Sequence, residues 1–469
     1  MKTLKYIAVL FSLLFCAELI LGFTGTVVMI GGIAIRHVLF ILAFAGLYAY
    51  FLVYLWVHKV KIFSLSKDAY FGSYTVIDWV AILFEVSMIL SMTVIPMIKG
   101  TNMHYAHSEA FDSAAIFSLY FPVAYLIKRD EFRMEKLLNW LKYMVCALSM
   151  THVAFYFAQD ADVKFIYNFF EGINKFLGGN SIAPSITLGH GGYTRIIFTT
   201  SIYMIVGLYI FFYNLEKNKW YDYIIAGLNV LAVLTTVTKS IWFGIGAGFG
   251  LYFIMAVLTN YKNNKKYIIK LILSLIIGVA IIFVSDNMIF GHIITIRMSN
   301  AFVIENKDDD NDKEYISEKE KYMNDLDKEG AVQSNQIKLE QVKHLTKKWF
   351  QSPILGWGYG SYVEGYLRSE TSPFSYEMVL FALLMKTGLL GLGIWCVFFA
   401  AQVIMQIKYK LKNCNHLLTW AFLAISMAVC VQTNPLLICF TGMSIVLLIS
   451  LISVQNVYDG MNEAIGVHE

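Results

Sequence analysis

A few charged residues lie beside long apolar segments, where a charge is costly and often functional. Lys239 stands between two apolar segments, and Arg195 stands at the start of another. A fixed positive charge in such a place can bind an anionic group, or it can anchor a helix among the lipid head groups. Glu377 precedes a further apolar segment, where a carboxylate can accept a proton or stabilise the first turn of a helix. The residue types alone leave these alternatives open.

A glycine-rich turn supplies a second group of candidate residues. Residues 353–361 read Pro-Ile-Leu-Gly-Trp-Gly-Tyr-Gly-Ser, and the alternating glycines permit tight bends and the close approach of another group. The turn is not a dinucleotide-binding or phosphate-binding loop, because no strand is predicted before it and no Gly-Lys-Ser/Thr ends it. Trp357 and Tyr359 can stack on sugar rings or pack the turn against the membrane interface. The pattern does not choose between these roles.

Four short motifs lie between roughly residues 235 and 395. They are Thr238–Trp242 (Thr-Lys-Ser-Ile-Trp), Lys338–Glu340 (Lys-Leu-Glu), Ser352–Gly360, and Lys386–Gly391 (Lys-Thr-Gly-Leu-Leu-Gly). The last three together resemble the conserved loop of the O-antigen polymerase and O-antigen ligase superfamily, and the first resembles that family's Ser-Arg-Gly segment. The rest of the chain is similar to the family in helix count and topology.

This resemblance implies a membrane glycosyltransferase that uses a polyprenyl-diphosphate-linked oligosaccharide donor at the outer leaflet, with no cofactor, metal or nucleotide donor. Because the leaving group is a diphosphate, fixed cations must hold its charge as the glycosidic bond breaks. The resemblance implies this role for Lys239, Arg195 and Lys338. A base or an anchor must face the acceptor hydroxyl, and Glu377 is the expected catalytic residue. Possible additional site residues are Arg297, His344, Tyr359 and Trp357.

The sequence departs from the family pattern at three of these positions. By its spacing from Pro353, Lys338 stands where the family usually has arginine, and Lys239 replaces the arginine of the Ser-Arg-Gly segment. Lysine keeps the charge but loses the bidentate fork of a guanidinium. By its spacing from Gly388, Glu377 stands where ligases usually have histidine. This last difference favours a polymerase over a ligase.

Several of the charged residues also have purely structural interpretations. Lys338 shares a predicted helix with other lysines, so it could belong to a solvated face. Asp78 and Glu85 are seven residues apart in a predicted span and lie on nearly the same helical face. Buried acids in a membrane are often functional, but they can instead pair with lysines such as Lys142 near helix ends.

The elements that position these residues follow from composition and apolar runs. Of 469 residues, 58% are hydrophobic and 15% are charged, a balance that excludes an ordinary soluble domain. Apolar runs of about 20 residues, each long enough to cross a bilayer as a helix, recur along the chain. We therefore predict an all-α integral membrane protein with about 12 transmembrane helices and one large, partly helical extracytoplasmic loop.

The predicted spans divide the chain into three parts. Residues 1–285 hold helices one to nine, residues 286–376 form the large loop, and residues 377–469 hold the last three helices and a cytoplasmic C-terminus. The spans lie near 7–23, 34–56, 76–98, 110–127, 138–157, 197–213, 221–237, 241–259, 268–285, 379–407, 417–433 and 437–454. The first run lies behind Lys2 and Lys5 like a signal peptide, but no small-residue cleavage site follows, so we interpret it as a retained helix.

Positive residues gather in alternate connections between the spans. They are Lys59, Lys61 and Lys67; Lys128, Arg129, Arg133 and Lys136; Lys217 and Lys219; Lys262, Lys265 and Lys266; and Lys408, Lys410 and Lys412. The positive-inside rule makes these connections and both termini cytoplasmic, and it places residues 158–196 and 286–376 outside. We expect a multi-pass protein of the bacterial inner membrane.

The large loop has two predicted halves. Glu305–Glu329 contains eleven acids and five lysines without an apolar period, which predicts a mobile, solvated excursion. Asp308, Asp309 and Asp310 lack the apolar surroundings that would fix a metal-binding geometry, so no metal site is expected there. From Ile337 to Phe350, the apolar spacing predicts an amphipathic helix that ends at Ser352-Pro353. All six cysteines lie in or beside apolar runs, which argues against a disulfide framework or a zinc site.

The leading hypothesis is a polymerase that joins polyprenyl-diphosphate-linked repeat units of O-antigen, capsule or another exopolysaccharide at the outer face of the inner membrane. The expected partners are the lipid-linked donor and acceptor glycans and membrane lipids, and a chain-length regulator is a further candidate partner. The dispersed net charge of +4 gives no indication of nucleic-acid binding.

Two other functions stay open. One is an O-antigen ligase that passes the polymer to lipid A-core. The other is a transporter or flippase of lipid-linked glycans, for which Asp78 and Glu85 would suit a translocation path. The lack of an internal repeat in the sequence disfavours the transporter.

Overall fold

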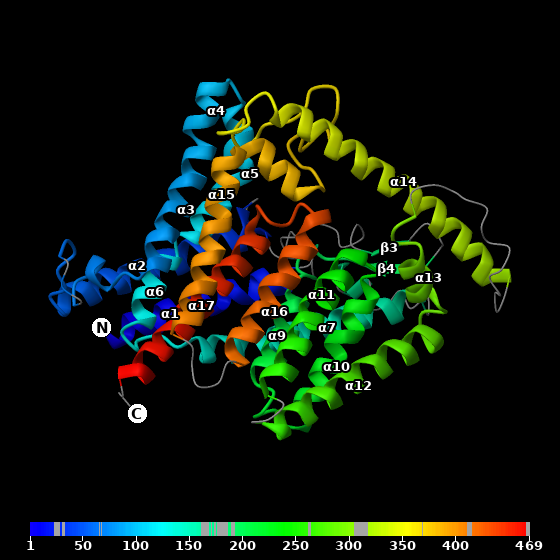
Figure 1. Cartoon of the computed structure of the whole chain (residues 1–469), viewed down its shortest axis with the longest axis horizontal. Helices are drawn as coiled ribbons and strands as arrows, with labels where there is room; N and C mark the ends of the chain where they lie inside the picture. Colours follow the sequence, from blue (N-terminus) through cyan, green and yellow to red (C-terminus); the bar gives the residue numbers. More distant parts are fainter. Residues whose placement is uncertain are drawn as a thin grey trace.

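The computed structural model describes residues 1–22, 29–30, 33–64, 66, 68–160, 168–169, 171–172, 175, 186–188, 193–260, 264–303, 318–367, 369–409 and 415–465. Lys67, Lys262, Lys410, Lys412 and the three aspartates from 308 to 310 lie outside these residues. The described chain is almost entirely helical (Figure 1). Its strands form two small antiparallel pairs: β1 (Met29–Ile30) with β2 (Ile33–Ala34), and β3 (Ile186–Leu188) with β4 (Thr194–Ile196).

Ten described helical segments are long and apolar enough to cross a membrane, and α9 and α10 are apolar helices of shorter length. The helices of the bundle are α1 (Lys2–Leu21), α2 (Ile35–Val57), α3 (Val76–Met92) with α4 (Val94–Lys99), α5 (Met103–Phe117) with α6 (Tyr120–Ile127), α7 (Met134–Asp160), α9 (Tyr203–Tyr213), α10 (Trp220–Thr235), α11 (Lys239–Asn260), α12 (Lys265–Met288), α15 (Val379–Lys408), α16 (Asn415–Cys430) and α17 (Phe440–Ile465). Each predicted apolar run coincides with one of these segments. The prediction of an all-α, multi-pass membrane fold is therefore confirmed.

Two helices of the large loop lie outside the bundle. They are α13 (Ile293–Ser299) and α14 (Glu318–Trp349). Figure 1 shows α14 running across the end of the bundle that lies away from both chain termini. Helix α14 packs on α13 and on α15, so it covers the ends of helices from distant parts of the chain.

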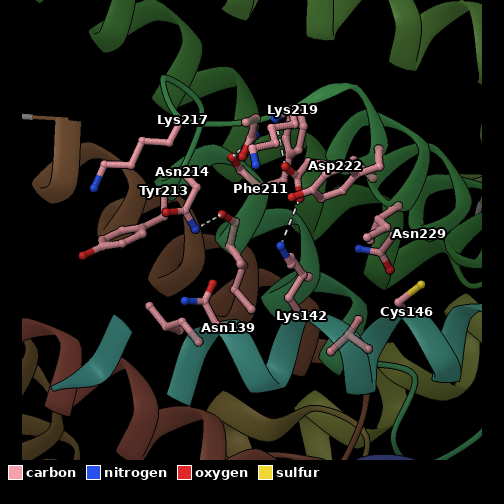
Figure 2. Close-up of a pocket in the computed structure, with 18 of the residues that line it drawn as sticks. Asn139, Lys142, Cys146, Phe211, Tyr213, Asn214, Lys217, Lys219, Asp222 and Asn229 are labelled. Carbon is pink, nitrogen blue, oxygen red and sulfur yellow. Dashed lines mark hydrogen bonds and ion pairs between the residues drawn. The ribbon is translucent and has the colours of Figure 1, made fainter. Parts of the chain in front are cut away.

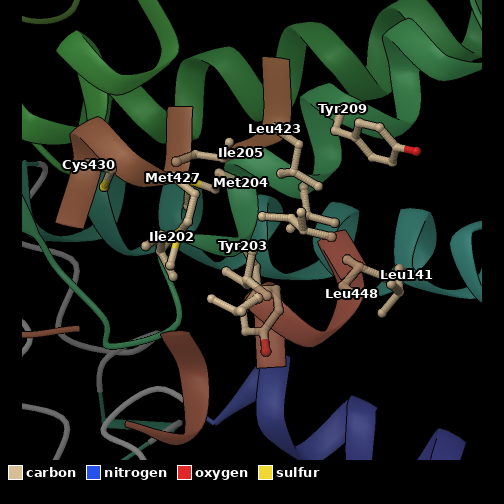
Figure 3. Packing of buried hydrophobic residues seen from close by; sticks show 14 of the residues in the cluster. Leu141, Ile202, Tyr203, Met204, Ile205, Tyr209, Leu423, Met427, Cys430 and Leu448 are labelled. Carbon is tan, nitrogen blue, oxygen red and sulfur yellow. The ribbon is translucent and has the colours of Figure 1, made fainter. Parts of the chain in front are cut away.

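The bundle has a buried centre and a lipid-facing edge. In the most apolar 18-residue window of each helix, 89% of α17 is buried but only 11% of α12. Figure 3 shows how side chains of α7, α9, α16 and α17 interlock around the centre, with Leu141, Tyr209, Leu423 and Leu448 from one helix each. Because lipid is as apolar as these side chains, close packing holds them together rather than exclusion of water.

The glycine-rich turn docks into a break in α15. At Gly388 the backbone leaves the helical conformation, with φ 64° and ψ −171°. The break frees backbone groups, and the turn binds them: Trp357 N–H donates to the Met385 carbonyl oxygen at 3.0 Å, and Gly358 N–H donates to that of Lys386 at 2.7 Å. Leu389 and Leu390 N–H donate back to the carbonyl oxygens of Pro353 and Ile354 at 2.9 and 3.0 Å. Two of the sequence motifs thus form one backbone junction.

The prediction for the first half of the large loop was wrong in part. Residues from Glu318 onward belong to α14, so Glu318–Glu329 is helical, whereas residues 304–317 lie outside the described chain. The helix docks through polar contacts: Asn324 and Asp327 are 2% and 1% exposed, and Asn324 Oδ1 accepts a hydrogen bond from Asn300 Nδ2 at 3.0 Å. A search for apolar spacing misses such a face. The predicted amphipathic helix is the second half of α14, which ends at Trp349.

Of the two intramembrane acids, Asp78 has partners other than Lys142, whereas Oε2 of Glu85 is buried with no hydrogen-bond partner among the described residues. Asp78 caps the N-terminus of α3 through Thr75, accepts a hydrogen bond from the Tyr120 hydroxyl at 3.0 Å, and forms an ion pair with Lys128. Lys142 instead pairs with Asp222, with Nζ and Oδ1 3.0 Å apart. Asp78 is therefore held by a helix cap and an ion pair, which weakens the case for a translocation path.

Candidate functional site

Four positive side chains gather at the end of the bundle that α14 covers. This cationic cluster consists of Arg195, Lys239, Arg297 and Lys338. Lys239 is the first residue of α11, and its Nζ donates to the Asn300 carbonyl oxygen at 3.2 Å. It also interacts electrostatically with Arg297, Lys338 and the carboxylate of Asp327. The cluster thus joins the end of a membrane span to both helices of the large loop.

Arg297 is held at the centre of the cluster by Asp327. Arg297 Nη1 lies 2.5 Å from Asp327 Oδ1, and the two side chains are 15% and 1% exposed. The guanidinium also donates to the Tyr193 hydroxyl and lies over that ring, 5.3 Å from its centroid. Its Nε is buried with no hydrogen-bond partner among the described residues. Asp327 therefore fixes the position of Arg297 and compensates one of the four positive charges.

Arg195 approaches the cluster from β4. Its Nε donates to the Thr236 carbonyl oxygen at 3.2 Å, and its Nη2 donates to the Thr238 hydroxyl at 3.3 Å. Burial and the neighbouring positive charge of Arg297 lower the pKa of Arg195 to about 10. A bound anion would favour the charged form of this buried guanidinium.

A residue one turn after Lys338 on α14, Gln341, hydrogen-bonds the backbone of Glu377. Gln341 lies three residues after Lys338, on the same side of the helix. Its Oε1 accepts hydrogen bonds from the backbone N–H groups of Glu377 and Met378 at 3.1 and 3.2 Å. These groups precede α15, so Gln341 takes over the capping function considered for Glu377. The backbone at the half-buried Glu377 is thereby tied to the helix that carries Lys338.

The other expected residues lie around the glycine-rich turn. His344 stacks on the ring of Tyr366, with centroids 4.5 Å apart. The Trp357 ring has Lys348 Nζ 4.2 Å from its centroid and Lys99 Nζ at 5.4 Å, and its Nε1 donates to the Lys348 carbonyl oxygen at 3.0 Å. These contacts favour a packing role for Trp357.

A cavity of about 340 Å³ lies next to this turn, and we call it the polar chamber. Its charged lining residues are Arg36, Glu109, Asp112 and Lys386. Lys386 forms an ion pair with Glu109 and donates to the Phe374 carbonyl oxygen at 2.7 Å. The other oxygen of Glu109 accepts a hydrogen bond from Gly360 N–H at 2.7 Å. This buried pair joins α5, α15 and the glycine-rich turn.

Hydroxyl and aromatic side chains complete the polar chamber. Arg36 lies over the Phe440 ring, 5.0 Å from its centroid, and interacts electrostatically with Asp112. Tyr359, fully buried, and Tyr376 also line the cavity. Carboxylates, hydroxyls and aromatic rings together can bind a sugar by hydrogen bonds and by stacking.

Glu377 is adjacent in sequence to the polar chamber and is bound to the helix that carries Lys338. The preceding residue, Tyr376, lines the chamber, while Gln341 ties the Glu377 backbone to the helix that carries Lys338. On the other side, Thr199 of the chamber follows Arg195 by four residues. An anion on the cluster and a sugar in the chamber could therefore meet near Glu377.

A second polar cavity, of about 260 Å³, lies at the opposite ends of the helices. Figure 2 shows Lys142 directed toward Asp222, with Asn139 and Asn229 nearby. Lys217 and Lys219, which mark the predicted cytoplasmic side, also line it. This cavity is separate from the candidate site, and the Lys142–Asp222 pair gives it a structural explanation.

The sequence did not single out the polar chamber or Asp327. Lys386 stood inside a recognised motif, but its partner Glu109 is 277 residues away. Glu109 and Asp112 are three residues apart where the predicted span 110–127 begins, and this spacing is the signal that could have indicated a polar helix face. Among the described residues, no group of three His, Cys, Asp or Glu side chains is placed to hold a metal ion.

The fold and site define a multi-pass membrane protein with a cation-rich site and an adjoining polar cavity at one end of its helices. Residues 224–396 match the family model described as O-antigen ligase. Over this segment the chain is similar to the O-antigen ligase/polymerase superfamily, whose members are membrane enzymes of the glycosyltransferase type. The matched segment contains Lys239, Arg297, Lys338 and Glu377. No curated protein and no solved structure matched the chain.

Proposed function

We propose that this protein is a polysaccharide polymerase of the bacterial inner membrane. It joins repeat units of O-antigen, capsule or a related exopolysaccharide that are carried on polyprenyl diphosphate, and it works at the outer face. The observation that carries the proposal is the cationic cluster, in which four positive side chains gather where a membrane span begins and a single carboxylate, Asp327, pairs with one of them. Such a site suits a membrane-anchored diphosphate.

The cationic cluster binds the donor diphosphate in this proposal. As the bond between the anomeric carbon and the phosphate oxygen breaks, its electron pair passes to the departing diphosphate. Arg195, Lys239, Arg297 and Lys338 stabilise the negative charge that develops there. Asp327 acts as a positioning residue, because it fixes Arg297 without cancelling the positive charge of the whole cluster.

The polar chamber binds the acceptor glycan, and Glu377 faces the acceptor hydroxyl. Glu377 takes the hydroxyl proton as the acceptor oxygen attacks the anomeric carbon. The new glycosidic bond forms on the side opposite the departing diphosphate, so the anomeric configuration inverts. The chamber-lining neighbour Tyr376 and the bond from the Glu377 backbone to the helix of Lys338 support this role.

A ligase is the second candidate, because the matching family model is described as O-antigen ligase. In that case the donor would bind in the same way, and the acceptor would be lipid A-core. Glu377, in the position where the family's ligases usually have histidine, favours the polymerase.

The glycan ladder of cells that lack this protein tests the proposal. A polymerase defect leaves single repeat units on lipid A, and the wild-type gene restores the ladder. Absence of any ligated glycan would instead identify a ligase, and an unchanged ladder would contradict both functions. Restoring the strain with the Glu377→Gln variant tests catalysis separately from the presence of the protein. The comparison requires that the amount of variant protein in the membrane equals that of the wild type.

A further inference from the structure

An apolar groove of about 350 Å³ lies between α9, α10, α11 and α12. Among the described residues that line it, none is charged, in contrast to the polar chamber. Each of α10, α11 and α12 contributes one glycine to its wall: Gly227, Gly246 and Gly278. The groove lies beside α12, the span with the smallest buried share, and is therefore next to lipid.

The groove ends at the cationic cluster. Trp242 lines it and lies one turn after Lys239 on α11. Met298 and Ile294 also line it, and they flank Arg297 on α13. From Trp242, the groove extends along α11 to Phe249, which is about 10 Å further by the helical rise. A molecule with an anionic head and an apolar tail would therefore find both binding surfaces joined.

The glycines of α11 have two different surroundings. A Cβ atom on Gly244 would lie 2.6 Å from the Ser426 carbonyl oxygen, and one on Gly248 would lie 2.7 Å from that of Phe422, so these two glycines permit close packing on α16. At Gly246 no atom lies within 4 Å of the Cβ position. Helix packing therefore does not explain Gly246, although glycine costs a helix about 1 kcal/mol relative to alanine. Gly246 leaves open space in the groove.

We propose that this groove holds the isoprenoid chain of the donor next to its diphosphate. The inference rests on the proposed function. Four cations at one end of an uncharged groove fit a diphosphate that carries a single chain. The methyl branches of an isoprenoid need lateral room, and Gly246 and Gly278 provide it, since neither has an atom within 4 Å of its Cβ position.

Binding of two probes by purified protein in nanodiscs tests this inference. The probes are undecaprenyl diphosphate and inorganic pyrophosphate, which has no chain. Gly246→Leu should weaken binding of undecaprenyl diphosphate by roughly tenfold, because leucine fills the space of the chain, and should leave pyrophosphate binding unchanged. Gly250→Leu is the matched control: it makes the same change on the same helix, has open space, and lies outside the groove lining.

Further variants separate failure of the groove from failure of the proposed function. Gly278→Leu repeats the test on α12 if Gly246→Leu does not fold. If the folded groove variants bind undecaprenyl diphosphate with wild-type affinity, the groove does not hold the isoprenoid chain. An equal loss of phosphatidylglycerol binding would also contradict the inference, because it would identify an ordinary lipid site. Lys239→Ala should weaken binding of both probes, and unchanged binding of both would contradict the donor site while leaving the groove result valid.

Discussion

Gly388→Ala should separate the glycine-rich turn from α15. A methyl group at this position would lie 2.2 Å from the Ile354 carbonyl oxygen, and the φ of 64° with ψ of −171° is essentially restricted to glycine. The oxygen belongs to the backbone, so no side-chain rotation can remove the overlap. The turn and the helix must move apart.

The magnitude follows from the contacts that this movement breaks. The backbone conformation alone costs alanine about 1 to 3 kcal/mol. Four hydrogen bonds join the turn to the break, and each contributes about 1 kcal/mol. Loss of all four brings the total to on the order of 5 to 7 kcal/mol. This is comparable to the stability of many domains.

Thermal unfolding of the detergent-purified protein measures this effect. Gly388→Ala should lower the melting temperature strongly or prevent accumulation of the protein in the membrane. Gly393→Ala is the control: it lies in the same helix, has no atom within 4 Å of its Cβ position, and should be neutral or slightly stabilising. Equal melting temperatures for Gly388→Ala and Gly393→Ala would refute the docking of the turn into the break.

Substitutions at three further positions have expected outcomes. Because burial and Arg297 lower the pKa of Arg195, Arg195→Gln should reduce polymer formation without lowering the melting temperature, and a large fall would show that the charge stabilises the fold. Glu377→Gln should shorten the glycan ladder, and Glu377→His should restore part of its length. An intact ladder from cells with the Glu377→Gln variant would show that Glu377 has no part in the mechanism. Lys386→Met should destabilise the protein by about 3 to 5 kcal/mol, because it leaves Glu109 buried without its ion-pair partner; an unchanged melting temperature would contradict this.

The membrane-spanning helices were predictable because the apolar composition of each segment indicates by itself that the segment lies in the membrane. A run of about 20 apolar residues satisfies its backbone internally and needs no information from the rest of the chain. Even α9, only 11 residues long, lies within a predicted run. Gly388 was different: glycine is common in membrane helices, so the sequence alone does not reveal that α15 breaks there.

The parts of the site that sequence could not predict depend on distant contacts. Asp327 lies in a charge-rich segment that resembles a solvated loop, and only its pairing with Arg297 makes it part of a docked helix. Glu109 and Lys386 meet only when α5 and α15 are packed. Lys239 could be singled out as a candidate site residue from the sequence, because it lies both in a family motif and at a position where a charge is costly.

The rate of polymer formation by Lys239 variants tests the central claim most directly. Lys239→Ala should lower the rate by roughly a hundredfold, because a contact to the leaving diphosphate is lost, and Lys239→Arg should retain activity. Lys343→Ala, which removes an exposed lysine of α14, is the control and should have no effect. Normal polymer formation by a correctly inserted Lys239→Ala protein would contradict the claim that the cationic cluster binds the donor diphosphate.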